Sequence, residues 1–462
     1  MKVLKGISGS NVAYVLSSQG ITIIVNLIMT IGVAKVLGIN DFGYWQLFLL
    51  YVSYTGFFHL GIFDGVYLRY GGKRMADLDL LEVRSVFWSA TSIQLLLLLL
   101  TYLIFLKTNF LNEGLVVPVL ITAFLTNTQF FLYFVLLATN NISKYSKAIL
   151  VEKGFFILAI FFYFFNDGKN FQVLIYIYGI GKILSISTLM NFFSFLFNRL
   201  VSFPQNLLLK IFQTGVLLML ANVTGAFILG IPRLFIEDRW GIEVFGKVSL
   251  AFSTIFFFIV LFSQLSLILF PVLRNKNFFQ QKESFLKLRD VLSRTLMLFF
   301  ILYFPLSSLL SFFMPTYEYS FVIFYYLLPI VIFDGLNQIL YLSYFKTLNL
   351  QKKLLGINII VVLFQILLIY TSFYFFENVI LILLITVLSI LLRSYLCELT
   401  LSKLFKISSS GSFIFEVIYS FLLISLHILG VEMIFIVLIA FFAILIHYKF
   451  RGLLLFVRVY EK

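Results

Sequence analysis

Long runs of apolar residues, scarcely interrupted by polar ones, follow one another along the whole chain, as in 95–106 and 359–370. A helix that spans a membrane needs about 20 predominantly apolar residues, whereas the strands of a membrane barrel alternate apolar and polar positions. The pattern therefore predicts an all-α integral membrane protein with about 14 transmembrane helices. The predicted spans lie approximately at 11–34, 42–67, 85–106, 115–139, 146–165, 171–196, 211–235, 245–273, 293–314, 321–345, 354–375, 379–401, 413–429 and 432–448.

The composition excludes most classes of soluble protein. Of the 462 residues, 61% are hydrophobic and 12% are charged, against roughly 45–50% and about 25% in soluble domains. HExxH, Walker A and GxSxG motifs are absent from the sequence, and the single cysteine, Cys397, rules out an intramolecular disulfide and a CxxC metal site. We therefore predict no catalytic residue, no cofactor and no metal site, and a protein that is not an enzyme.

The basic residues are distributed unequally between the two sides of the predicted membrane. With the N-terminus placed in the cytoplasm, 26 Lys and Arg residues fall on the inner side and 6 on the outer side. This asymmetry follows the positive-inside rule. We predict a multi-pass protein of the cell membrane with both termini in the cytoplasm. The net charge of +14 then reflects topology and anionic lipid headgroups, and no nucleic acid partner is expected.

An internal repeat divides the chain. Segments 37–47 and 240–250 both read G-I-x-x-F-G-x-x-x-L at an offset of 203, and Gln129 and Asn140 are echoed by Gln338 and Asn349 at an offset of 209. Glycines 38 and 241 in the first motif predict tight external turns. Parallel repeats of this kind are typical of transporters. We predict an N-terminal six-helix lobe at 1–200, a C-terminal six-helix lobe at 201–401, and two additional transmembrane helices with a cytoplasmic tail at 402–462.

Polar residues inside the predicted spans are candidates for function, because a charge at the bilayer centre costs roughly 2.5–3.5 kcal/mol on insertion scales. The basic candidates for binding an anionic substrate are Lys182, Arg233 and Arg393. The alternative is structural: Arg393 would pair with Glu398 or Glu416, and Lys182 would snorkel toward the interface or meet an acidic neighbour.

Acidic and amide residues form a second set of candidates. Asp334, Asn337 and Gln338 share a helix face as an ion or sugar contact, or equally as a helix-packing surface. Asp64 lies near the inner interface, and with Asp334 it is the candidate for ion coupling. The five-residue spacing of His59 and Asp64 predicts that their side chains point to different faces of one helix.

Several motifs resemble those of the O-antigen (polysaccharide) flippases of the multidrug/oligosaccharidyl-lipid/polysaccharide exporter superfamily. The segments that carry the resemblance are 36–43, 60–66, 69–72, 221–224 and 230–236. The resemblance implies two pseudo-symmetric six-helix lobes in a V-shaped exporter architecture, with a cavity that opens alternately to each side. It further implies that Arg69 gathers a diphosphate at the inner face and that Asn222 matches an asparagine of the family. Pro232 stands where relatives carry an aspartate, which removes an acidic role at that position.

The cargo that the resemblance implies is an undecaprenyl-diphosphate-linked oligosaccharide, an O-antigen or capsule repeat unit of lipopolysaccharide and polysaccharide biosynthesis at the bacterial inner membrane. Membrane lipids, a coupling H⁺ or Na⁺ and a polysaccharide polymerase are the further partners it suggests. The alternatives are an ion-coupled multidrug exporter of the same fold and a membrane enzyme such as a polymerase or glycosyltransferase. An enzyme is disfavoured because the longest external connection, 236–244, is too short to hold an active site.

Overall fold

The computed structural model describes residues 17, 20–108, 112–166, 168–198, 205–274, 277–407, 411–432 and 434–446. These residues form helices joined by short turns, and no strand occurs among them. Most of the polar start of the first predicted span and the tail after residue 446 lie outside the described residues. The longer helices are α3 (Ile39–Ser53), α5 (Leu80–Thr108), α6 (Glu113–Ala138), α7 (Ile142–Phe165), α8 (Phe171–Met190), α9 (Gln205–Arg274), α10 (Phe278–Phe313), α11 (Glu318–Leu336), α13 (Gln351–Phe375), α14 (Val379–Phe405) and α15 (Gly411–Ile428).

Shorter elements complete the described part. They are the helices α2 (Val33–Val36), α4 (Ile62–Tyr70) and α12 (Leu342–Thr347), the π-helical turns Ile28–Gly32 and Asn337–Tyr341, and the 3₁₀ turns Thr55–His59, Met75–Asp77, Ser194–Phe197 and Pro315–Tyr317.

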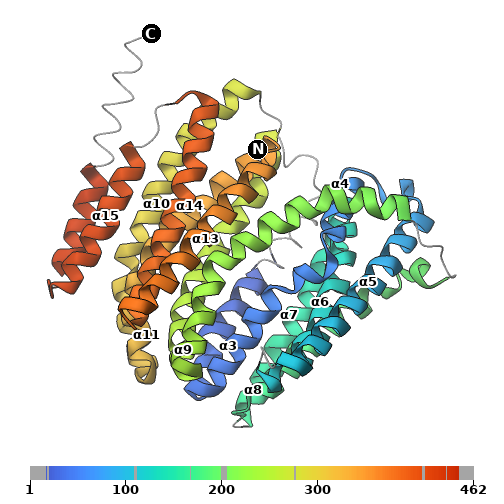
Figure 1. Cartoon of the computed structure of the whole chain (residues 1–462), viewed down its shortest axis with the longest axis horizontal. Coiled ribbons are helices and arrows are strands. Elements are labelled where there is room, and N and C mark those ends of the chain that lie inside the picture. Colours follow the sequence, from blue (N-terminus) through green and yellow to red (C-terminus); the bar gives the residue numbers. More distant parts are fainter. Residues whose placement is uncertain are drawn as a thin grey trace. The chain divides into compact units, whose positions relative to one another are not determined.

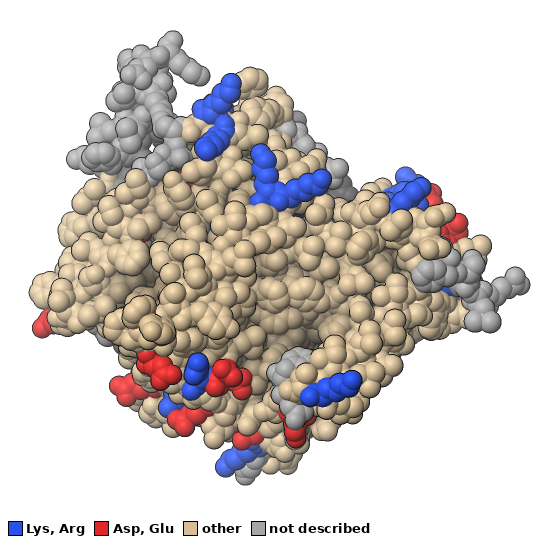
Figure 2. Space-filling view, viewed as in Figure 1, with Lys and Arg blue, Asp and Glu red and all other residues tan. Residues whose placement is uncertain are grey.

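Eight helices in the described residues are long and apolar enough to cross a membrane, and ten if each of two bent helix pairs counts as one span. Their outer faces are apolar and exposed, as at Leu95, Leu99 and Leu103 of α5. On the face shown in Figure 2, charged side chains gather toward the helix ends. The chain is therefore an all-helical, multi-pass membrane protein.

The chain folds as two compact units, Met1–Gly230 and Ile231–Lys462, and α9 runs from the first into the second. In the first unit, shown in blue to green in Figure 1, α6 packs against α4 and α8, and α7 packs against α8. In the second unit, α11 packs against α10 and α14, and α13 against α14. α11 is the most enclosed of these helices, since 83% of the apolar window that contains it is buried.

The second predicted span is broken. α3 and the 3₁₀ turn Thr55–His59 end at Leu60 and Gly61, whose φ angles of 50° and 77° are left-handed, and α4 continues at an angle of 65°. Gly61 also allows a close approach to α9, because a Cβ atom there would lie 2.7 Å from the backbone of Val216. An alanine fits neither the dihedral nor the space. The backbone break therefore depends on this glycine.

Gly241 divides α9 as the repeat motif predicts. Its φ of 77° interrupts a helix of 70 residues, which at 1.5 Å per residue would otherwise extend over roughly 100 Å. Arg233 and Ser249 lie on opposite sides of this break and are hydrogen-bonded at 2.9 Å. The equivalent Gly38 differs: its φ is −62°, so at that position the turn does not require a glycine.

The second repeat signal also has a structural counterpart. Asn140 follows α6 with a φ of 57°, and Asn349 follows α12 with a φ of 55°. Both turns are closed by the same 2.8 Å bond, from the amide after the asparagine to the carbonyl five residues earlier. This left-handed helix ending satisfies free carbonyl groups at a helix C-terminus. The same turn geometry thus recurs at the spacing of the sequence repeat.

Candidate functional site

A buried polar centre lies between α6, α7 and α8 of the first unit. The Nζ of Lys182 lies 3.1 Å from Glu152 Oε1 and donates to Gln129 Oε1 at 2.9 Å, while the Gln129 amide donates to Glu152 Oε2 at 2.7 Å. Tyr133 and Ser185 extend the network, with their hydroxyl oxygens 2.7 Å apart. All five side chains are buried. Lys182 therefore meets an acidic neighbour, which was one of the two alternatives for it.

The second unit has a corresponding centre on α11, α13 and α14. Arg393 lies 3.3 Å from Asp334 Oδ1, and its Nε donates to Asn358 Oδ1 at 3.0 Å. Gln338 donates to the other oxygen of Asp334 at 3.4 Å. Asn337 is buried beside them at the start of the π-helical turn. The expectation that Arg393 pairs with Glu398 or Glu416 is wrong, because Asp334 takes that place.

The two centres share a plan. In each unit a basic side chain on α8 or α14 meets one carboxylate and one amide from two other helices, α7 and α6 in the first unit and α11 and α13 in the second. The carboxylate comes from α7 in the first unit and from α11 in the second. Because charge removed from water is stable only when paired and hydrogen-bonded, each centre ties three helices together.

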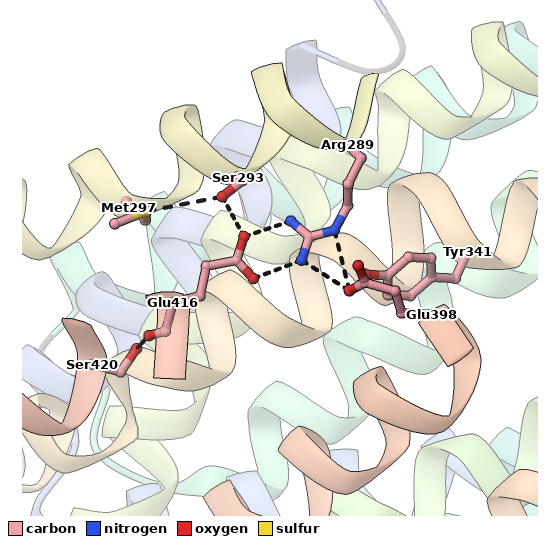
Figure 3. Close-up of polar contacts among 7 residues, drawn as sticks. All are labelled: Arg289, Ser293, Met297, Tyr341, Glu398, Glu416 and Ser420. Atoms are coloured by element: carbon pink, nitrogen blue, oxygen red, sulfur yellow. Dashed lines mark hydrogen bonds and ion pairs between the residues drawn. The ribbon is translucent and has the colours of Figure 1, made fainter. Parts of the chain in front are cut away.

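Glu398 and Glu416 belong to a third centre, which the sequence analysis did not predict. Figure 3 shows Arg289 of α10 between the two carboxylates, 2.9 Å from Glu398 Oε2 and 2.5 Å from Glu416 Oε1. Ser293 donates to Glu416, and Tyr341 donates to Glu398 at 2.9 Å. Arg289 lies before the predicted span 293–314 and was therefore counted among the 26 basic residues of the inner side, which gave no reason to expect a buried ion pair. The carboxylate five residues after the start of α15 could have been a signal, because it interrupts an apolar span.

His59 and Asp64 come together across the break in the second span. The His59 Nε2 lies 4.0 Å from Asp64 Oδ2, and the His59 Nδ1 accepts a 3.1 Å hydrogen bond from the amide of Gly61. The expectation that the two residues face different ways is therefore wrong. It assumed a continuous helix, whereas the left-handed backbone at 60 and 61 turns α4 by 65° and redirects Asp64.

The remaining candidates lie apart from these centres. Arg69 is exposed near the end of α4 and pairs with Glu82 at 2.8 Å. Arg233 is buried against the rings of Phe245 and Phe252, with its guanidinium carbon 5.4 and 5.7 Å from their centroids. Asn222 is exposed on the first half of α9.

Searches for similar sequences give no result: no known protein family and no curated protein matches the chain. Solved structures do match. The lipid II flippase MurJ in its inward closed conformation superposes with a TM-score of 0.64 at 15% identity, covering 97% of this chain and 100% of MurJ. A multidrug resistance MATE family transporter of the MOP superfamily superposes in its inward-facing conformation with a TM-score of 0.61 at 12% identity, covering 85% and 96% of the two chains.

An outward-facing MATE transporter of the same superfamily matches with a TM-score of 0.58 at 13% identity, over 84% of this chain and 95% of that chain. The likeness at this low identity is one of fold. This chain therefore shares its fold with the solved MATE and MurJ structures.

Proposed function

We propose that this protein is a flippase that moves a polyprenyl-diphosphate-linked oligosaccharide from the inner to the outer leaflet by alternating access. The observation that carries the proposal is the match to a lipid II flippase along 97% of the chain, against 85% for the multidrug transporter. α15, the helix that follows the second copy of the repeat, also bears on this choice. α15 is fixed within the second unit through Glu416 and is not a detached appendage.

The proposed architecture has 14 spans. Besides the eight long helices and the two bent pairs, three shorter apolar helices occur at Gly20–Val36, Ser412–Ile428 and Ile434–Ile446. Gly241 divides the span counted as Gln205–Phe257 in two. An even number of spans places both termini on the same side of the membrane, and the distribution of Lys and Arg assigns that side to the cytoplasm.

For the cargo site, we propose that Arg69 gathers the diphosphate at the inner face and that Arg233 contacts it during passage. A sugar-diphosphate headgroup is anionic, so it requires basic contacts while its lipid tail stays in the bilayer. Asn222, Asn337 and Gln338 are proposed sugar contacts. Lys182 and Arg393 are paired and Arg233 is buried against Phe245 and Phe252, so contact of these three with cargo requires a rearrangement around each of them.

Ion coupling is proposed for Asp64 and Asp334. Asp64 adjoins both an imidazole and a backbone break, so that a proton or Na⁺ bound there would act on the angle between α3 and α4. A polysaccharide polymerase is the proposed protein partner.

A second candidate function, favoured by the MATE matches, is ion-coupled export of cationic drugs. Cationic drugs bind to carboxylates, and four buried carboxylates here, Glu152, Asp334, Glu398 and Glu416, are already held by Lys or Arg. The same pairs also occupy Lys182, Arg289 and Arg393, so the buried charges do not separate the two cargoes, and the greater coverage of the flippase match favours the anionic one. Removing the gene from its native host separates the two functions. The flippase requires that lipid-linked oligosaccharide accumulate on the inner leaflet, whereas an exporter predicts unchanged glycan and higher sensitivity to cationic dyes.

A further inference from the structure

Two arginines occupy equivalent positions in the sequence repeat. Arg84 of α5 lies in Leu81-Glu82-Val83-Arg84-Ser85-Val86, and Arg289 of α10 lies in Leu286-Lys287-Leu288-Arg289-Asp290-Val291, so both read L-x-[VL]-R-x-V. The offset of 205 lies between the offsets of the two other repeat signals, as expected if loops lengthen gradually along the second copy. Both arginines are buried: 6% of the surface of Arg84 and 2% of the surface of Arg289 are exposed.

In the first unit this position holds the segment that leaves α8. Arg84 Nε donates to the carbonyl of Phe195 at 2.6 Å, and one turn later Trp88 Nε1 donates to the carbonyl of Leu196 at 2.7 Å. Both acceptors belong to the 3₁₀ turn Ser194–Phe197, which precedes α9. Two donors at positions i and i+4 of α5 thus fix the beginning of the connection to the next repeat.

In the second unit the same two positions hold the segment that follows α14. Arg289 binds Glu416 of α15, and one turn later Ser293, the equivalent of Trp88, donates to Glu416 as well. α15 follows α14 in the chain as the 194–197 turn follows α8. The donors keep their positions, and the acceptor changes from backbone carbonyls to a carboxylate.

We propose that Arg84 and Arg289 are a duplicated latch, which fastens to each unit the segment that leaves its last repeat helix. In the first copy the latch holds the connection into α9, and in the second copy it holds α15. The latch makes α15 a fixed part of the second unit during any conformational change.

The second latch makes additional contacts. Arg289 also binds Glu398 on α14, so one guanidinium joins α10, α14 and α15. Tyr419 of α15 donates to the carbonyl of Met297 at 3.0 Å. A transmembrane helix has little hydrophobic drive to leave lipid for protein, so buried polar contacts of this kind determine where it docks.

Spin-label distances in the full-length protein test the latch. Exposed serine and threonine positions accept the labels: Ser92→Cys with Ser194→Cys reports on the first latch, and Thr295→Cys with Ser425→Cys reports on the second. The native Cys397 is buried and does not compete for label. Arg84→Met is expected to broaden only the first distance distribution, and Arg289→Met only the second, each roughly twofold as the segment detaches.

Matched controls are Lys107→Met on α5 and Lys287→Met on α10, because both lysines are exposed on the helices that carry the latches. These variants are expected to leave both distributions unchanged. If either arginine variant fails to fold, Trp88→Phe and Ser293→Ala remove one latch hydrogen bond each and should broaden the same distances to a smaller extent. Unchanged distributions in the arginine variants, or equal broadening of both distances by each variant, would overturn the proposal.

Discussion

The Nζ of Lys182 lies 3.1 Å from Glu152 Oε1 in the interior of the first unit, and Lys153 lies 3.0 Å from the same oxygen. Because Glu152 has two basic neighbours, substitutions of Glu152 and of Lys182 should differ in their effect on stability. Glu152→Gln leaves the buried Lys182 without a counter-charge and should lower the free energy of unfolding by about 3–5 kcal/mol. Lys182→Met should cost less, because Lys153 still neutralises Glu152.

Thermal unfolding in detergent measures this order. The double variant Glu152→Gln/Lys182→Met is expected to be more stable than Glu152→Gln alone, since it removes both buried charges. Lys247→Met, which breaks a more exposed pair with Glu243, serves as the control and should change little. A Lys182→Met protein less stable than Glu152→Gln would contradict the arrangement.

Gly61 should tolerate no side chain. Gly61→Ala is expected to cost at least about 1–3 kcal/mol, because it places alanine in a left-handed conformation and a Cβ atom 2.7 Å from the α9 backbone. The matched control is Gly154→Ala in α7, where no atom lies within 4 Å of the added Cβ; alanine should stabilise that helix by about 1 kcal/mol. Equal unfolding temperatures for the two variants would show that the break does not need glycine.

The contact between His59 and Asp64 predicts how substitutions of these two residues would change the coupling of transport to an ion gradient. Asp64→Asn should remove the dependence of transport on the proton or sodium gradient while keeping transport down the cargo gradient. His59→Gln should weaken this dependence without removing it, because the carboxylate remains. Transport by vesicles with and without an imposed gradient measures both effects. A gradient response that survives Asp64→Asn would exclude this residue from coupling.

Substitution of Arg233 tests whether an anionic cargo contacts this residue during transport. Arg233→Gln keeps a polar side chain but loses the charge, and the loss of a charge-assisted contact of about 1.5–3 kcal/mol corresponds to a transport rate lowered roughly 10- to 100-fold. Membrane insertion should be unaffected, as immunoblots of membrane fractions would show. Asn222→Ala, at an exposed amide on the same helix, should reduce transport much less. Normal transport by Arg233→Gln would remove this residue from the cargo path.

Hydropathy alone predicted most of the helices, because each apolar run must satisfy its backbone hydrogen bonds internally and bury itself in lipid or protein. It could not predict the break at Leu60 and Gly61, since a left-handed pair leaves the apolar pattern unchanged. The partners of the buried charges were also beyond the sequence. Arg393 has acidic residues nearer along the chain than Asp334, and only the packing of α11 against α14 selects Asp334.

Arg289 shows what the repeat could have revealed. Its position just before the predicted span 293–314 made it an ordinary basic residue of a predicted cytoplasmic loop, and only its equivalence to Arg84 within the L-x-[VL]-R-x-V pattern distinguishes it. The acceptors could not have been found in this way, because one latch binds carbonyls and the other a carboxylate. Repeated donors are visible in a sequence, whereas acceptors that differ between the copies need coordinates.

Reconstitution tests the central claim most directly. The purified protein would be placed in vesicles whose membranes carry polyprenyl-diphosphate-linked oligosaccharide from the native host, and the glycan reaching the opposite leaflet would be measured with a lectin or glycosidase. The account predicts rapid, protein-dependent exposure of the glycan, greatly slowed by Arg233→Gln, with no accumulation of a cationic dye in the same vesicles. Dye transport without exposure of the glycan would contradict it.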